Sequence, residues 1–290
     1  MKKTINVLLP YLQLIRYRNC LMAAIGTLIG VFIAYNILPT TSITYSAEIL
    51  IIKALLAFVS VFFITGAGNS INDYFDVDID AINRPSRPIP AGKVTEQNAL
   101  YFSTALFIAG MVAAFSVNYI CAVIAGINVL VLIYYARSLK RKALVGNISI
   151  GYLTGSIFLF GGSVFGMEGL MMLSILFLLA ALATMAREIV KDIEDIEGDR
   201  LSGASTLPIK IGVKRSVYTA SFIVAVALVA SPLPYIISIL GTGYLYAVAI
   251  ADLLFILAII EVGLRDNAAR SSRLFKAGMV FALIAFIAGA

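Results

Sequence analysis

The stretch Asn69-Ser-Ile-Asn-Asp-Tyr-Phe-Asp-Val-Asp-Ile-Asp80 directs the interpretation of the whole chain, because it places four carboxylates at the end of a long apolar run. Successive residues of a helix turn by about 100°, so three of these acids share one narrow sector of the helix surface. The carboxyl end of a helix already carries a partial negative charge, and acids gathered there repel it and one another. A bound cation removes that conflict. The residues in or beside the sector are Asn69, Asn72, Asp73, Asp76 and Asp80.

The same arrangement recurs 119 residues later, where another apolar run ends in D-x-x-D-x-x-x-D. A single acidic cluster is ordinarily a solvated helix end, whereas two clusters in matching register favour one shared site. Carboxylates suit Mg²⁺, which proteins commonly hold with a few acids together with substrate phosphates. We therefore predict a magnesium-diphosphate site whose metal-binding and catalytic residues are Asp73, Asp76, Asp80, Asp192, Asp195 and Asp199.

The composition places the chain in a membrane. Of its 290 residues, 61% are hydrophobic and 13% are charged, and the mean hydropathy is +0.97. A soluble domain is nearer half apolar and a quarter charged. A β-barrel would need repeated short alternating segments, which the sequence lacks. The absence of histidine excludes histidine-based catalysis and most zinc sites. We expect an all-α polytopic membrane protein with no nucleic-acid partner.

Nine apolar runs are long enough to cross a hydrocarbon core of about 30 Å. The third and fourth nearly abut and predict a tight hairpin, and prolines in the seventh predict a kink or an early end. Gly151 and Gly155 predict a helix-packing face in the fifth. The predicted spans are 20–38, 49–72, 99–117, 119–135, 145–165, 170–186, 217–239, 244–264 and 274–290.

The offset between the two acidic motifs also predicts how the spans are organised. Four spans separate the copies, so spans one to four and five to eight form two parallel pseudo-repeats, with the ninth span added. The acidic helices of the two repeats then face each other across a central cavity. We expect the whole chain, residues 1–290, to be a single transmembrane domain.

The basic residues predict the orientation. All but Lys53 of the 22 lysines and arginines lie in five segments that nine spans place on one face of the membrane. Because basic loops stay on the cytoplasmic side, we expect a cytoplasmic N-terminus, an external C-terminus and a cytoplasmic active site in the cell membrane.

Several polar side chains near the acidic motifs are candidates for binding the anionic part of a substrate. Arginines at the mouth of the first span and cations between spans four and five can also be membrane anchors. The loop after the first motif can be a surface linker, although its position favours closing over a diphosphate. Negative charge that builds on a leaving diphosphate needs such cations. The candidates are Arg16, Asn19, Asn69, Asn72, Arg84, Arg87, Lys140, Arg141, Asn147 and Lys191.

A site for magnesium and diphosphate at the mouth of an apolar helical cavity suits a substrate with one charged end and one long apolar end. A prenyl diphosphate fits this description. The allylic C–O bond then ionises to a carbocation that the cavity screens from water. A transporter is the alternative from another class, but transporters place binding groups near the membrane midplane, whereas these acids gather at one face.

The motifs N-D-x-x-D-x-x-x-D at 72–80 and D-x-x-D-x-x-x-D at 192–199, with Y-x-x-x-L-K-R near 135–141, resemble those of the UbiA superfamily of intramembrane prenyltransferases over nearly the whole chain. The resemblance implies a ring of helices around an apolar cavity with a cytoplasmic cap, and prenyl transfer that depends on Mg²⁺.

Within that family, the sequence N-D-Y-F-D-V-D-I-D-A-I-N-R-P-S-R-P-I-P-A-G is most similar to an archaeal branch that makes ether lipids. This similarity implies transfer of a geranylgeranyl group from geranylgeranyl diphosphate to the sn-2 hydroxyl of geranylgeranylglyceryl phosphate, a lipid-like phosphorylated acceptor. The alternative within the family is another acceptor, namely chlorophyllide or an aromatic acid that is a quinone precursor.

Overall fold

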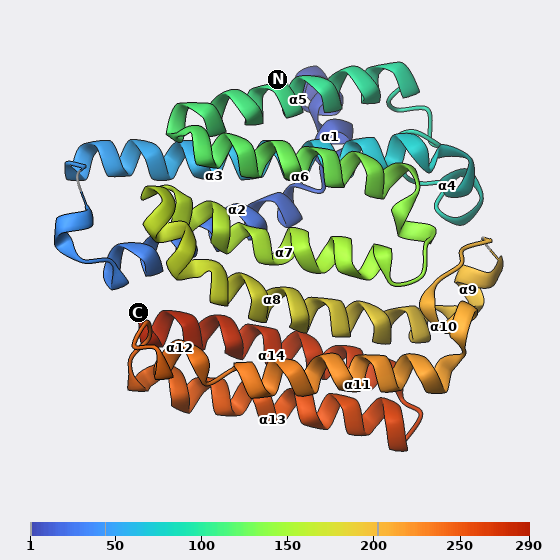
Figure 1. Ribbon diagram of the computed structural model, residues 1–290. Helices are drawn as coiled ribbons and strands as arrows, with labels where there is room; N and C mark the ends of the chain where they lie inside the picture. Colours follow the sequence, from blue (N-terminus) through green and yellow to red (C-terminus); the bar gives the residue numbers. More distant parts are fainter. Residues whose placement is uncertain (1, 44, 202) are drawn as a thin grey trace.

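The computed structural model describes residues 2–43, 45–201 and 203–290, and helices make up nearly all of this part of the chain (Figure 1). The elements are α1 (Lys2–Leu14), α2 (Tyr17–Ile37), η1 (Thr40–Ser42), α3 (Ala47–Phe75), α4 (Val77–Asn83), α5 (Glu96–Val117), α6 (Tyr119–Arg137), η2 (Leu139–Arg141), α7 (Val145–Ser163), α8 (Gly166–Glu194), α9 (Ile196–Leu201), α10 (Leu207–Ile211), α11 (Val213–Ala230), α12 (Leu233–Ile236), α13 (Thr242–Leu264) and α14 (Ala268–Gly289).

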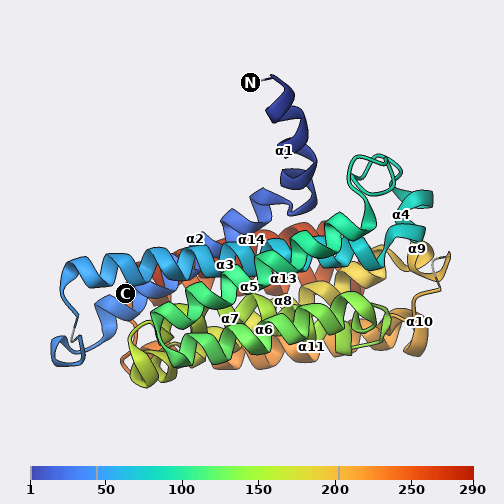
Figure 2. The ribbon, with the colours of Figure 1, turned by 90° about the horizontal axis from the view of Figure 1, so that it is seen from above.

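Within these residues, nine helical segments are long and apolar enough to cross a membrane, which confirms the predicted all-α fold with nine spans. They are α2, α3, α5, α6, α7, α8, the segment Val213–Ile236, α13 and α14. The chain is a multi-pass membrane protein. The long helices run side by side in Figure 1, and α1 extends away from the bundle in Figure 2.

The two spans that carry an acidic motif both extend past their predicted ends. Helices α3 and α8 each have 29 residues, or about 44 Å at 1.5 Å per residue, against a hydrocarbon core of about 30 Å. The predicted sixth span ended where the charged residues begin, but charge does not end a helix. The ends of both helices therefore extend beyond the apolar layer, where carboxylates can be hydrated.

The short helices that follow the acidic motifs lie at one end of the bundle. Figures 1 and 2 both place α4 and α9 at this end, together with α10, while α12 and the C-terminus lie at the other. The loops carrying the predicted cations join helices at the same end as α4 and α9. The pseudo-repeats and the cytoplasmic cap stay predictions.

Helices α7 and α8 pack with their backbones nearly in contact, as the small residues of α7 predicted. A Cβ atom added at Gly155 would lie 2.5 Å from the carbonyl oxygen of Phe177, and one at Gly151 would lie 2.8 Å from that of Ala181. Backbone atoms cannot move aside as a flexible side chain can. Glycine is therefore needed at these positions for close approach and not for an unusual backbone angle.

The predicted hairpin between the third and fourth spans is present, and Asn118 forms it. Its side chain accepts a hydrogen bond from the Cys121 amide at 2.9 Å, which caps α6, and donates one to the Ser163 carbonyl at 2.7 Å. At the same end, the Lys53 ammonium donates to the Val117 carbonyl at the end of α5. The one basic residue outside the five basic segments thus stabilises a helix C-terminus.

The seventh span ends early, as its prolines predicted. Helix α11 stops at Ala230, and Pro232 and Pro234 lie in the turn that leads to α12. The intramembrane acid Asp252 accepts a hydrogen bond from the Ser231 hydroxyl at 2.6 Å. The Tyr244 hydroxyl donates to the Ser231 carbonyl. Asp252 therefore belongs to a polar cluster that holds the end of α11 against α13.

The close contact of α7 and α8 can be tested with two alanine substitutions. Gly155→Ala pushes a methyl group against the Phe177 carbonyl, so we expect a loss of about 1–3 kcal/mol in the free energy of unfolding. Gly126→Ala is the matched control, since its nearest neighbour would be the Met111 Cε atom at 3.8 Å. Titration with a denaturing detergent, monitored by circular dichroism, measures both. Equal stability of the two variants would contradict the packing described here.

Candidate active site

Each acidic motif contains a break in its helix at the middle aspartate. Asp76 ends α3 with φ −100° and ψ 6°, and Asp195 ends α8 with φ −95° and ψ 8°. Both angles lie in the bridge region, which is sparsely populated and common at active sites. The amide of Asp76 donates to the Asn72 carbonyl, and that of Asp195 donates to the Lys191 carbonyl. The two motifs therefore share a backbone conformation as well as a sequence pattern.

The two motifs line one large polar hollow of about 1210 Å³. Acids of the first motif are brought together there with acids of the second, and with five of the predicted cations. The predicted site residues in its wall are Arg16, Asn72, Asp76, Asp80, Arg84, Arg87, Lys140, Arg141, Asp195 and Asp199.

Arginine and lysine side chains neutralise the first motif. Asp73, which is 4% exposed, accepts from Arg16 at 2.6 Å and from Arg87 at 3.0 Å. The same Nη1 atom of Arg87 also donates to Asp80. Asp76 lies 2.5 Å from the Lys140 ammonium. These cations lie where charge on the acids would otherwise be unopposed at the end of α3.

Arg16 reaches the site because of an unusual turn between α1 and α2. It has φ 52° and ψ 58°, a left-handed conformation that non-glycine residues seldom adopt. The Asn69 side chain donates to the Ile15 carbonyl at 2.8 Å, which fixes the residue before the turn. Tyr11 packs edge-on against Phe102, which holds the end of α1 against α5. Asn69 thus positions Arg16 in this structure.

Lys140 connects the large hollow to a smaller polar one. Its ammonium donates to Asn72 Oδ1 at 3.1 Å, and the side chain lines both spaces. Burial lowers the pKa of Lys140, and the hydrogen bond with Asp76 acts in the opposite direction. A cation held in a partly dry position interacts strongly with any anion that reaches it.

The smaller hollow, of about 30 Å³, lies against the second motif. Asn147 donates to Asp192 there at 2.8 Å, so the predicted asparagine does reach the acids. Glu188 lines the same space and is paired with Arg187. On the far side of the break, burial raises the pKa of Asp199, and the charge of Lys191 opposes that rise.

The loops on the two sides of the site are tied together by the backbone. The Ser205 amide donates to the Arg141 carbonyl at 2.9 Å, and Lys142 and Ser205 form an isolated parallel bridge. The basic loop that carries Lys140 is thus attached to the loop after the second acidic motif.

Some predicted site residues line neither hollow. Asn19 and Lys191 are exposed, and the Asn69 amide is engaged with the Ile15 carbonyl. Conversely, the sequence did not single out Tyr135 and Glu188 as site residues, yet both line the smaller hollow. Both residues lie within motifs that are visible in the sequence. The sequence does not show that their side chains reach the smaller hollow, because that depends on how the helices pack against one another.

No ready-formed metal centre is present in the described part of the chain, since no three acidic or cysteine side chains there are close enough to hold an ion. The donor set nevertheless fits Mg²⁺, which keeps several waters and uses one or two carboxylates together with substrate phosphates. Four aspartates face one hollow that is also rich in cations. That combination suits a metal that arrives with a diphosphate.

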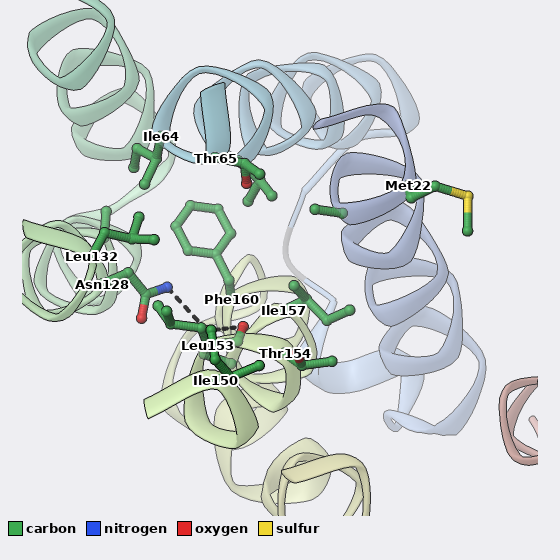
Figure 3. A pocket seen from close by; sticks show the side chains of 14 residues that line it. Met22, Ile64, Thr65, Asn128, Leu132, Ile150, Leu153, Thr154, Ile157 and Phe160 are labelled. Carbon is green, nitrogen blue, oxygen red and sulfur yellow. Dashed lines mark hydrogen bonds between the residues drawn. The ribbon is translucent and has the colours of Figure 1, made fainter. Parts of the chain in front are cut away.

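An apolar cavity of about 340 Å³ lies among α2, α3, α6 and α7 (Figure 3). Its wall is formed mainly by aliphatic side chains and Phe160, with the polar side chains of Thr65, Thr154 and Asn128 among them. Asn128 donates to the Ser156 hydroxyl at 3.0 Å. Ile150 lines both this cavity and the smaller polar hollow. The polar and apolar spaces therefore adjoin, with Lys140 and Ile150 at the two junctions.

The fold and the site together define an integral membrane protein in which paired acidic helix ends lie next to an apolar cavity inside the bundle. Comparison with known proteins gives the family. The model of the UbiA prenyltransferase family matches residues 23–287, and the chain belongs to this family.

Relatives of known name agree with this assignment. Digeranylgeranylglyceryl phosphate synthase of Methanosarcina mazei is 56% identical over 281 residues, which are 96% of this chain and 97% of the relative. A solved structure of digeranylgeranylglyceryl phosphate synthase superposes with a TM-score of 0.85 at 45% identity and covers 98% of both chains. A UbiA homologue from Archaeoglobus fulgidus, bound to GPP and Mg²⁺, has the same fold with a TM-score of 0.68 at 16% identity, covering 96% of this chain and 99% of that one.

The ion pairs of Asp73 can be tested by removing its charge. Asp73→Asn leaves Arg16 and Arg87 facing a neutral amide. Breaking a buried pair costs about 3–5 kcal/mol, and we expect at least about 2 kcal/mol here because the Arg16 side chain is 34% exposed. Denaturing-detergent titration measures the loss. Asp78→Asn, at an exposed position of the same stretch, is the control, and equal effects of the two would refute the assignment.

Proposed function

We propose that the chain transfers a geranylgeranyl group from geranylgeranyl diphosphate to the sn-2 hydroxyl of geranylgeranylglyceryl phosphate. The observation that carries this proposal is the single hollow lined by acids of both motifs, which adjoins the apolar cavity through Lys140 and Ile150. The likeness to synthases of this lipid over nearly the full chain supports the choice of substrates.

The diphosphate end of the donor binds in the large hollow. Mg²⁺ supplies charge neutralisation for the leaving group when it is bound there. Its ligands in this proposal, directly or through water, are Asp73, Asp76, Asp80, Asp192, Asp195 and Asp199. Arg16, Arg87 and Lys140 pair with carboxylates in the structure and donate to diphosphate oxygens when those carboxylates turn to the metal. Arg84 and Arg141 face the same hollow and assist them.

The prenyl chain occupies the apolar cavity, which keeps water from the reactive carbon. The C1–O bond breaks with its electron pair going to the diphosphate, and the acceptor hydroxyl oxygen then donates a pair to C1 and loses its proton. Asn72 and Asn147 hold Lys140 and Asp192 in place for these steps. Asn19, Asn69 and Lys191 also belong to the proposed substrate-binding residues, although they do not line the hollow.

The reaction is tested with purified protein, labelled geranylgeranyl diphosphate, geranylgeranylglyceryl phosphate and Mg²⁺. We expect the ether product to form, and to disappear when a strong chelator is added. Chlorophyllide and 4-hydroxybenzoate serve as competing acceptors. Preferred transfer to either of them would replace the proposed acceptor while leaving prenyl transfer intact.

The paired motifs are tested by Asp76→Asn and Asp195→Asn. Each removes a carboxylate that lines the hollow, so we expect kcat/KM for the donor to fall at least about 100-fold, or about 3 kcal/mol of transition-state stabilisation. Asp78→Asn is the matched control, because Asp78 lies outside the wall of the hollow and is exposed. Full activity of the Asp195→Asn enzyme would remove the second motif from the site.

We also propose that the N-terminus and the active site face the cytoplasm and that the C-terminus lies outside. The basic loops at the end of the bundle near α4 and α9 support this orientation. In right-side-out vesicles, the Lys93→Cys variant should react with a membrane-impermeant thiol reagent only after the vesicles are opened. The Thr41→Cys variant should react in intact vesicles. Both positions are exposed, while Cys20 and Cys121 are buried, and the reverse pattern would invert the topology.

A further inference from the structure

The two short helices at the site carry exposed apolar side chains at equivalent positions. Ile82 lies in the last turn of α4 and is 82% exposed, and Leu201 ends α9 and is 90% exposed. They are 119 residues apart, the offset that also separates Asp80 from Asp199. A single exposed leucine or isoleucine needs no explanation. Two at matching positions of a duplicated motif do.

Both side chains lie in the wall of the large polar hollow. Most of the other residues in that wall are charged or polar, among them Arg84 and Asp199. Neither side chain belongs to the packed apolar clusters of the described residues. An apolar residue is a poor ligand for diphosphate, and its placement here calls for a different role.

The helix breaks give these residues a way to move. Helices α4 and α9 have seven and six residues, and each is joined to its long helix at an aspartate with bridge-region angles. Hinges of lids are commonly a few residues at the ends of elements. Asp76 and Asp195, at the two breaks, line the hollow themselves. Any group that draws these two acids together draws the short helices together as well.

We infer that Ile82 and Leu201 meet over the bound diphosphate and exclude water from the reacting carbon, so that they set the ratio of prenyl transfer to hydrolysis. This inference rests on the proposed function. Contact between the two side chains removes apolar surface from water and covers part of the hollow whose wall they form. Closure of this kind protects a reactive intermediate from water.

The two outcomes differ only in the nucleophile. In transfer, the acceptor hydroxyl oxygen forms a bond with C1, the C1–O bond to diphosphate breaks, and the hydroxyl proton is released. In hydrolysis, a water oxygen forms the bond with C1, the same C1–O bond breaks, and a water proton is released to give the free prenyl alcohol and diphosphate. The ratio of the two products therefore reports water exclusion directly.

The first test measures that ratio in the double variant Ile82→Ser, Leu201→Ser. We expect the fraction of donor released as prenyl alcohol to rise at least five-fold, with the donor KM nearly unchanged. The exchange Ile82→Leu, Leu201→Ile keeps both side chains apolar and should restore the wild-type ratio. Val213→Ser, at an exposed apolar position outside the hollow, is the matched control. An unchanged ratio in the double serine variant would overturn the inference.

The second test measures closure without a prenyl substrate. In the double variant Ile82→Cys, Leu201→Cys, a mild oxidant should form the disulfide at least ten-fold faster with inorganic diphosphate and Mg²⁺ than without them. The native cysteines are buried, and the two single-cysteine variants control for their reaction. Equal rates with and without diphosphate would refute closure. Failure of wild-type protein to transfer any prenyl group would instead refute the proposed function, and this second test would still decide the closure.

Discussion

The site depends on the balance between carboxylates at two helix ends and the cations that face them. Each acidic helix ends in a partial negative charge that its own aspartates reinforce. On the first helix, Arg16, Arg87 and Lys140 supply the compensation. They come from the turn before the first span and from two different loops. Residues far apart in the sequence must therefore assemble before the carboxylates can be held close together.

This balance suits the family's chemistry. Cations that neutralise acids in one state can neutralise a diphosphate in another, provided that a metal takes over the acids. The close backbone packing of α7 against α8 holds the second acidic helix at a fixed place. The large polar hollow, the smaller one and the apolar cavity adjoin at Lys140 and Ile150, which places a charged space near an apolar one for a substrate with one charged and one apolar end.

Much of this arrangement could be predicted from the sequence, because membrane spans and duplicated motifs are local patterns. Spans, the Asn118 hairpin and the early end of the seventh span followed from hydropathy and from prolines. The pairing of Arg87 with two aspartates did not follow, since it depends on how the loop folds back. Nor did the bond from Asn69 to the Ile15 carbonyl, because a polar side chain on the acidic face looks like a ligand until its partner is known. Lys191 shows the same limit, as it is exposed.

The backbone link between Ser205 and Arg141 has a consequence for how the family can vary. Surface loops ordinarily tolerate added residues at little cost. Here an insertion on either side of the link would shift Lys140 relative to the second motif, so the lengths of two loops are constrained jointly. Variation in length is then confined to other connections, and these two segments can change in composition more freely than in size.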